Sequence, residues 1–145
     1  MALPSGLAAI SVALTTFLKS GDHLLMTDSV YEPVRKLCDK ILGAQGIETS
    51  YYDPTIGAGI AGLIRDNTRI VYVESPGSLT FEVQDIPAIA AAAHERGAVV
   101  IADNTWASPF FGKPMKLGAD LVVESATKYV AGHSDVMSGF IAMRR

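Results

Sequence analysis

The sequence predicts an α/β domain in which a mostly parallel sheet is flanked by helices. Two observations carry this prediction: short β-type runs alternate with helical patterns along the chain, and several of those runs are apolar throughout. Alternating β and α units favour a parallel sheet, and continuous apolar runs are typical of strands covered on both faces. No linker, internal repeat or low-complexity tract interrupts the pattern, so we expect residues 1–145 to form a single domain.

Six segments are expected to form the strands, because they are short, rich in apolar residues and bounded by turn residues. In chain order they are His23–Thr27, Thr49–Asp53, Ile70–Glu74, Ala98–Asp103, Leu121–Ser125 and Phe140–Met143. Parallel neighbours in a sheet need a crossover connection, which is usually a helix, and helical patterns lie between most of these segments.

The first two helical patterns lie on either side of the first predicted strand. Ser5 can cap a helix that runs to about Lys19, and Gly21 can close it. A second helix is expected near Pro33–Leu42, where the apolar residues fall on one stripe of the helical surface. An apolar stripe of this kind indicates a helix that packs against the sheet.

Two later helices are expected just before predicted strands. Asp85 can cap a helix over Ile86–Arg96, which has a proline in its first turn and Gly97 just beyond its end. Gly118 is expected to stop a short helix before the strand that begins at Leu121.

Composition and charge exclude several classes of protein. The chain is 49% hydrophobic and has a net charge of −3, so no basic face for nucleic acid is expected. The apolar stretch Leu7–Leu18 is too short to span a membrane, and we interpret it as a buried helix. Cys38 is the single cysteine, so no intrachain disulfide can form, and we expect a cytoplasmic protein. No spacing of histidine, cysteine and acidic residues predicts a metal site.

Distinctive polar and aromatic residues gather where the predicted strands end. In open α/β sheets, ligands bind outside the carboxyl ends of the strands. The segments at those ends are Asp28–Tyr31, Glu74–Ser78, Asp103–Trp106 and Ser125–Lys128. We therefore expect a ligand site at this edge of the sheet.

Two charged residues in these segments suit the cofactor pyridoxal phosphate (PLP). Asp103 ends a predicted strand, and an acid there can keep the pyridine nitrogen of PLP protonated, so that the ring serves as an electron sink. At about 4 Å and an effective dielectric constant of about 20, such a pair is worth roughly 4 kcal/mol. Lys128 supplies an amine. Taken alone, the aspartate fits a turn or a helix cap equally well, and a lone lysine fits a surface loop.

Phosphate donors and a residue that stacks on a ring complete the set. The helix start at Gly6 and Leu7 offers free N–H groups and a positive dipole, and glycine lets a phosphate approach the backbone. Ser125 and Thr127 can add hydroxyl donors, and Tyr31 can stack on a planar ring. Each feature alone is also an ordinary cap or loop residue, but together they are the groups that PLP requires.

At these residues the sequence resembles the Cys/Met-metabolism family of PLP-dependent transsulfuration enzymes, over essentially the whole chain. The most specific segment is Ser125-Ala126-Thr127-Lys128-Tyr129, which continues to Gly132-His133-Ser134-Asp135. Asp103-Asn104-Thr105 and Glu74-Ser75-Pro76 fit the family as well. The resemblance implies the large PLP-binding domain of fold type I, with a last strand that runs antiparallel.

The resemblance also implies a role for each candidate residue. Lys128 carries the cofactor and later moves the α-proton of the substrate, Asp103 pairs with the pyridine nitrogen, and Tyr31 stacks on the ring and takes part in proton transfer. The groups that hold the phosphate are backbone N–H groups of the helix start and hydroxyls of the lysine loop, from Gly6, Leu7, Ser125 and Thr127.

Within the family, the sequence is most similar to the bacterial enzymes that cleave cystathionine by β-elimination. Gly77-Ser78 stands where γ-type relatives tend to have Thr/Ser-Asn-Pro, and Trp106 stands where many have phenylalanine or tyrosine. This similarity implies a homo-oligomeric carbon–sulfur lyase of methionine biosynthesis that forms homocysteine, pyruvate and ammonia. A γ-synthase or γ-lyase activity and a truncated α/β module without catalysis stay open as alternatives.

Family members are much longer than this chain. They have an N-terminal segment with a Tyr-x-Arg motif that reaches the phosphate in the neighbouring subunit, and a C-terminal domain whose arginine binds the substrate carboxylate. We find neither in these 145 residues. We therefore expect an incomplete PLP-binding domain that is weakly active or inactive alone.

Overall fold

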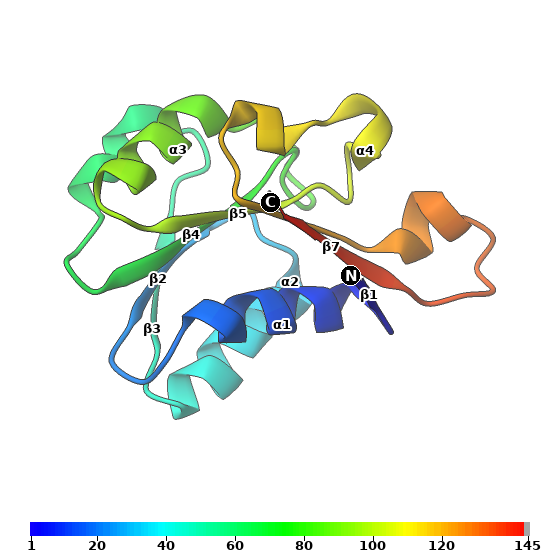
Figure 1. Cartoon of the computed structure of the whole chain (residues 1–145), viewed down its shortest axis with the longest axis horizontal. Coiled ribbons are helices and arrows are strands. Elements are labelled where there is room, and N and C mark those ends of the chain that lie inside the picture. Colours follow the sequence, from blue (N-terminus) through cyan, green and yellow to red (C-terminus); the bar gives the residue numbers. More distant parts are fainter. Residues whose placement is uncertain (144–145) are drawn as a thin grey trace.

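A seven-stranded sheet runs through the centre of the computed structural model, which describes residues 1–143 (Figure 1). The strand order is β1-β7-β6-β5-β4-β2-β3. The bounds are β1 (Ala2–Leu3), β2 (His23–Thr27), β3 (Glu48–Tyr52), β4 (Thr68–Glu74), β5 (Val99–Asp103), β6 (Leu121–Glu124) and β7 (Gly139–Met143). The pairs from β3 to β6 are parallel, whereas β7 is antiparallel to β6 and β1 is antiparallel to β7.

The prediction of a mostly parallel sheet with an antiparallel last strand is confirmed. All six predicted strands are present, with ends that differ from the expected ones by two residues at most. The strand β1 has no counterpart among the predictions, because two residues show no periodicity that a sequence pattern could reveal.

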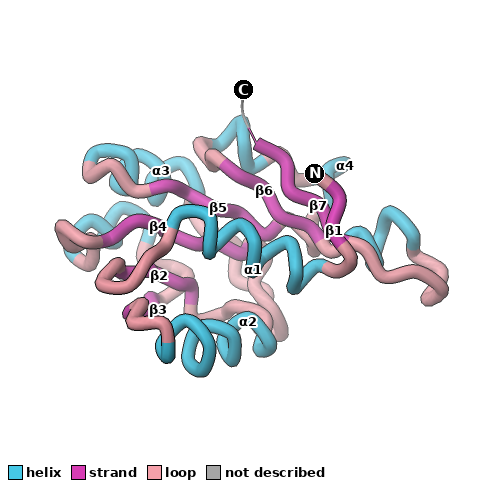
Figure 2. Tube along the Cα trace, turned by 60° about the horizontal axis from the view of Figure 1, so that its bottom comes forward, coloured by secondary structure: helices cyan, strands magenta, loops and turns pink. Residues whose placement is uncertain are grey.

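Helices cover both faces of the sheet (Figures 1 and 2). The first helix, α1 (Gly6–Phe17), lies on one face with α2 (Glu32–Lys36), which continues into the π-helical η1 (Leu37–Leu42). On the other face lie α3 (Ile86–Glu95) and the 3₁₀ segment η2 (Gly57–Gly62). Short segments follow the later strands: α4 (Ser108–Phe111), the 3₁₀ turn η3 (Pro114–Leu117) and the π-helical turn η4 (Thr127–Ala131).

The predicted helix ends largely agree with the structure. The hydroxyl of Ser5 accepts a hydrogen bond from the N–H of Ala8 at 3.1 Å, and the carboxylate of Asp85 accepts one from Ala88 at 3.1 Å. Both are side-chain caps of the expected kind. Gly118 closes η3 with a φ of 115°, a conformation that favours glycine.

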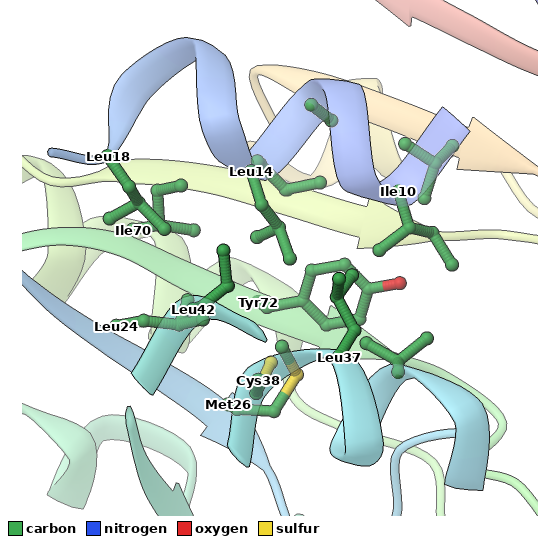
Figure 3. Packing of buried hydrophobic residues seen from close by; sticks show 14 of the residues in the cluster. Ile10, Leu14, Leu18, Leu24, Met26, Leu37, Cys38, Leu42, Ile70 and Tyr72 are labelled. Atoms are coloured by element: carbon green, nitrogen blue, oxygen red, sulfur yellow. The ribbon is translucent and has the colours of Figure 1, made fainter. Parts of the chain in front are cut away.

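Alternate residues of the buried strands pack into two separate cores, one on each face. Met26 and Tyr72 face α1 and η1, together with Leu14 and Cys38, as Figure 3 shows. Val71, the neighbour of Tyr72, faces α3 instead. Covering both faces leaves the ends of the strands as the part of the sheet that can receive a ligand.

Candidate active site

Four segments of the predicted site follow the carboxyl ends of the parallel strands. They come after β2, β4, β5 and β6, and the start of α1 joins them from below the sheet in Figure 1. The turn η4 (orange), the start of α1 (dark blue) and α4 (yellow) lie toward the same side of that view. This is the edge at which the sequence predicts a ligand.

Asp103 is the last residue of β5 and is 8% exposed. Its two carboxylate oxygens accept hydrogen bonds from the hydroxyl of Tyr72 at 3.2 Å and from the N–H of Thr105 at 2.9 Å. Burial raises the pKa of Asp103, and the hydrogen bonds from Thr105 and Tyr72 act in the opposite direction. A cation that approaches this carboxyl would favour its ionised form, so the position suits the partner of a protonated ring nitrogen.

The start of α1 packs directly against the loop after β6. Gly6 is buried, and a Cβ atom placed on it would lie 2.6 Å from the Cβ of Ser125. The N–H groups of Gly6 and Leu7 have no hydrogen-bond acceptor within residues 1–143, as expected for a first helical turn. Glycine therefore brings a helix N-terminus and a serine hydroxyl close together, an arrangement that suits a small anion.

Thr105 links the aspartate to the serine loop. Its N–H donates to Asp103, and its hydroxyl accepts a hydrogen bond from the N–H of Ser125 at 2.8 Å. Sequence reasoning assigned no role to Thr105, since a contact between residues 20 positions apart leaves no local pattern. The link holds the predicted phosphate loop at a fixed place beside the predicted pyridine partner.

Lys128 lies on the turn η4, just past β6, and is exposed. Its backbone N–H donates to the carbonyl of Ser125 at 3.0 Å, and Gly132 ends the turn with a φ of 71°. Within the described residues, its Nζ has no hydrogen-bond or ion-pair partner. An unpaired amine on a short turn next to Ser125 fits a residue that bonds to a cofactor.

The hydroxyl of Thr127 has partners in the protein. It donates to the carbonyl of Ser138 at 3.1 Å and accepts from the N–H of Ser138 at 2.9 Å. A hydroxyl has one proton to donate. Thr127 can donate to a phosphate only if it gives up its bond to the Ser138 carbonyl, whereas Ser125 keeps its hydroxyl proton available.

Tyr31 stands at the start of α2, and its side chain is exposed. Its N–H donates to the carboxylate of Glu74 at 2.9 Å. Glu74 ends β4, and its Cα pairs with that of Asp103 across β4 and β5. The structure therefore ties the backbone of the predicted ring-stacking residue to the strand that adjoins Asp103.

Glu74 itself is a buried carboxyl with a perturbed pKa. Burial, with a smaller contribution from the charge of Asp103, raises its pKa to about 7. The sequence places Glu74 at a strand end and in a family motif, but its hydrogen bond to a residue 43 positions away could not be predicted from the sequence.

An aromatic pair lies farther along the same edge. Trp106 and Phe81 meet edge to face, with ring centroids 5.8 Å apart and an angle of 86° between the rings. Both are about half exposed, at 51% and 55%. Trp106 therefore follows Asp103 at the ligand edge and contacts a residue of the loop after β4.

A cavity of about 550 Å³ lies beside Tyr31. It is lined by the loops after β2 and β4, including Arg35, Ser78 and Glu82, but by neither Asp103 nor Lys128. We assign it as a hollow that adjoins the candidate site, because the groups suited to PLP lie around Asp103 and Ser125.

Within residues 1–143, no group of three or more histidine, cysteine or acidic residues could hold a metal ion. In the same part of the chain, no helix is both long and apolar enough to cross a membrane.

The groups at this edge fit PLP. The buried Asp103 suits the ring nitrogen, the Gly6–Ser125 contact suits the phosphate, and Lys128 suits the aldehyde carbon. Fold and site together define a PLP-binding α/β domain.

Comparison with known proteins identifies the family. The sequence model of the Cys/Met metabolism PLP-dependent enzymes matches residues 1–145, and the chain belongs to this family. The family prediction made from the sequence is therefore confirmed.

Among its relatives, a putative cystathionine beta-lyase of Rhizobium johnstonii is 51% identical over 140 residues, which are 97% of this chain and 35% of the relative. A cystathionine beta-lyase of Escherichia coli is 46% identical over 138 residues, or 94% and 35% of the two chains. The crystal structure of a cystathionine gamma-lyase from Lactobacillus plantarum in complex with L-serine matches with a TM-score of 0.96 and 34% identity. It covers 100% of this chain and 38% of that one. The chain thus spans about a third of the length of these proteins.

Proposed function

We propose that this chain forms the PLP-binding core of a carbon–sulfur lyase that acts on cystathionine by β-elimination in methionine biosynthesis. The observation that carries the proposal is the placement of Asp103 and Lys128 after neighbouring strands, with Ser125 packed on Gly6 between them. An acid, an amine and an anion-binding helix start at one sheet edge are the groups on which PLP chemistry depends.

We propose a role for each of these residues that is consistent with its placement. PLP, when bound, supplies an electron sink for negative charge at the α-carbon of an amino acid. Asp103 would pair with the ring nitrogen, and Tyr31 would cover the ring. The N–H groups of Gly6 and Leu7 would hold the phosphate together with two hydroxyls. One hydroxyl is that of Ser125, and the other is that of Thr127, which would first give up its bond to the Ser138 carbonyl.

Lys128 acts as the base in this proposal. Its Nζ takes the α-proton of the substrate, and the bond between the β-carbon and sulfur then breaks to release a thiol. With cystathionine and one water, the products are homocysteine, pyruvate and ammonia. Tyr31, at the start of α2, is proposed to assist the proton transfer.

Sequence differences and the names of relatives support β-elimination over the γ-type reactions. Gly77-Ser78 and Trp106 differ from the residues usual in γ-type relatives, and two of the relatives named above carry cystathionine beta-lyase names. The L. plantarum structure, which bears a gamma-lyase name, keeps the γ-type alternative in place. Product analysis separates them, because β-elimination yields pyruvate and γ-elimination yields 2-oxobutyrate.

We also propose that the chain is one incomplete large domain of a longer, cytoplasmic homo-oligomer. Its coverage of about 35% of the E. coli relative supports this, as do exposed aromatic residues such as Phe110 and Phe111, which are 79% and 82% exposed. Monomeric proteins rarely expose large apolar patches. Sedimentation of the purified chain measures its association directly.

The decisive experiment is cofactor trapping. PLP is added to the purified chain, borohydride reduces any imine bond, and peptide mass mapping locates the label. We expect a visible absorbance band before reduction and a phosphopyridoxyl mass on Lys128 after it, and neither in the variant Lys128→Ala. Lys116→Ala, a change at another lysine on a short turn, serves as the matched control and should keep the label.

A label on another lysine, or none, would contradict the cofactor site in this chain. The same measurement on the E. coli relative, with this segment in place of its own, then separates a wrong assignment from an incomplete domain. Pyruvate formation by that hybrid tests the reaction. An unlabelled and inactive hybrid would favour the truncated module without catalysis.

A further inference from the structure

Both carboxylate oxygens of Glu74 are engaged by loops that border the candidate site. One oxygen accepts from the N–H of Tyr31 at 2.9 Å, and the other accepts from the hydroxyl of Ser78 at 2.6 Å. The two donors come from different loops, which follow β2 and β4. Glu74 is 7% exposed, so these bonds form where little water competes.

A carboxyl at this position is unfavourable for the sheet itself. Burial of a charged group is costly unless hydrogen bonds compensate, and the three residues of β4 before it, Val71, Tyr72 and Val73, are fully buried and uncharged. Packing alone does not explain an acid at the end of β4. Its two hydrogen bonds indicate that it holds the loops that follow β2 and β4.

The loop after β4 depends on such contacts. Leu79 and Phe81 have φ values of 66° and 63°, in a region that residues other than glycine adopt rarely. Conformations of this kind persist only where the surroundings hold them. The bond from Ser78 to Glu74 anchors the loop just before these residues, and Phe81 then reaches the ring of Trp106.

Tyr31 depends on Glu74 as well. No hydrogen bond from its side chain occurs within the described residues, and half of the residue is exposed. Its position is set through its backbone, by the bond to Glu74 and by its own carbonyl, which accepts from Val34 at 2.9 Å. Since Glu74 is paired with Asp103 across two strands, the bond fixes Tyr31 relative to Asp103.

We propose that Glu74 is a positioning residue, which holds Tyr31 and the Ser78 loop at a fixed place relative to Asp103 through one hydrogen bond to each. The proposal rests on the proposed function, because Tyr31 matters there as the residue that covers the PLP ring. Glu74 does not touch the cofactor; it acts through the two loops.

Two substitutions at Glu74 separate positioning from charge. Glu74→Gln keeps both bonds, since its carbonyl oxygen can accept from Tyr31 N–H and its amide can donate to the Ser78 hydroxyl. Glu74→Met has nearly the same length but accepts no such bond. Ser78→Ala removes only the hydrogen bond from Ser78 to Glu74 and should leave the bond from the Tyr31 N–H intact.

Amide hydrogen exchange of the 145-residue chain, measured by NMR without PLP, reads the bond to Tyr31 directly. We expect exchange at the Tyr31 amide about tenfold faster in Glu74→Met than in the wild type, and nearly unchanged in Glu74→Gln and Ser78→Ala. The amide of Asp28, which donates to Tyr52 at 2.8 Å, is the internal control and should stay protected throughout. PLP binding should weaken about tenfold in Glu74→Met and less in Glu74→Gln.

The two proposals fail in different ways. Unchanged Tyr31 exchange and PLP affinity in Glu74→Met would overturn the positioning role even if Lys128 is labelled. A wild-type chain that is not labelled at Lys128 would count against the proposed function, while the exchange data still decide whether Glu74 holds the loop. If the Asp28 amide also loses protection in Glu74→Met, then Glu74→Asp, whose shorter carboxylate cannot reach both donors, replaces it with the same expected result.

Discussion

Asp103 and Glu74 end neighbouring strands, yet their carboxyl groups meet different partners. Asp103 accepts from Tyr72 and Thr105, which hold it in place at the sheet edge. Glu74 accepts hydrogen bonds from the N–H of Tyr31 and the hydroxyl of Ser78, so both of its carboxylate oxygens bind loop residues. The two acids are paired on adjacent strands, but Asp103 is suited to bind a cationic ligand, whereas Glu74 supports the loops around the site.

At the residue scale, the substitution Asp103→Asn tests the ring partner. Asparagine keeps an acceptor for Thr105 but removes the charge, and an ion pair at about 4 Å and an effective dielectric constant of about 20 is worth roughly 4 kcal/mol, or about three pKa units. We expect the ring nitrogen of bound PLP to be protonated at neutral pH in the wild type and not in the variant, as ¹⁵N NMR of labelled PLP reports. Asp66→Asn, at an exposed position, should leave the ring nitrogen protonated.

At the element scale, the strands and the capped helices could be predicted because their signals are local. An apolar run predicted β5, and a side-chain cap predicted the start of α3. The turn η4 could not be predicted, since five residues carry no helical period, although the sequence did single out its lysine. The hydrogen bonds from Ser125 to Thr105 and from Tyr31 to Glu74 could not be predicted for another reason, because each joins residues 20 or more positions apart.

The contact between α1 and the β6 loop can be tested with Gly6→Ala. The new Cβ would lie 2.6 Å from the Cβ of Ser125, so helix and loop must move apart. Overpacking of this kind costs about 1–3 kcal/mol. We expect a loss of unfolding free energy in that range and weaker PLP binding. Urea unfolding and PLP titration measure the two effects.

Gly62→Ala is the matched control for this substitution. A Cβ at Gly62 meets no atom within 4 Å, so its effect on stability should stay within about 0.5 kcal/mol. Equal effects of the two substitutions would contradict the close contact that brings the helix start to Ser125.

At the scale of the whole molecule, the two cores stabilise the sheet, whereas the edge at the strand ends carries the polar groups of the site. The cores on both faces of the sheet bury nearly all residues of the central strands β2, β4, β5 and β6, such as Leu24 on one face and Leu25 on the other. The polar groups of the site are added only where the strands end. Each of the neighbouring strands β4, β5 and β6 ends in a buried carboxyl, from Glu74, Asp103 and Glu124, and burial raises the pKa of each. We therefore expect these carboxyls to lower the stability of the cofactor-free fold at neutral pH.

The pH dependence of stability measures this effect for Glu74. Its pKa is about 7 in the folded chain, above the ordinary value of 4.5 expected after unfolding. Between these values the folded chain holds a proton that the unfolded chain has released, so the contribution of Glu74 to stability falls as the pH rises. We expect the unfolding free energy of the wild type, relative to Glu74→Gln, to fall by about 3 kcal/mol from about pH 4 to pH 8.

Urea unfolding of both PLP-free proteins across this range provides the comparison. Groups that titrate in both proteins and are not coupled to Glu74 cancel in the difference. The buried His23, whose pKa is lowered by burial, is an example. A difference that stays flat or rises with pH would mean that Glu74 is ionised at little cost in the fold. In that case its two hydrogen bonds would fully compensate for its burial, and the stability lost to the site would come from Asp103 and Glu124 alone.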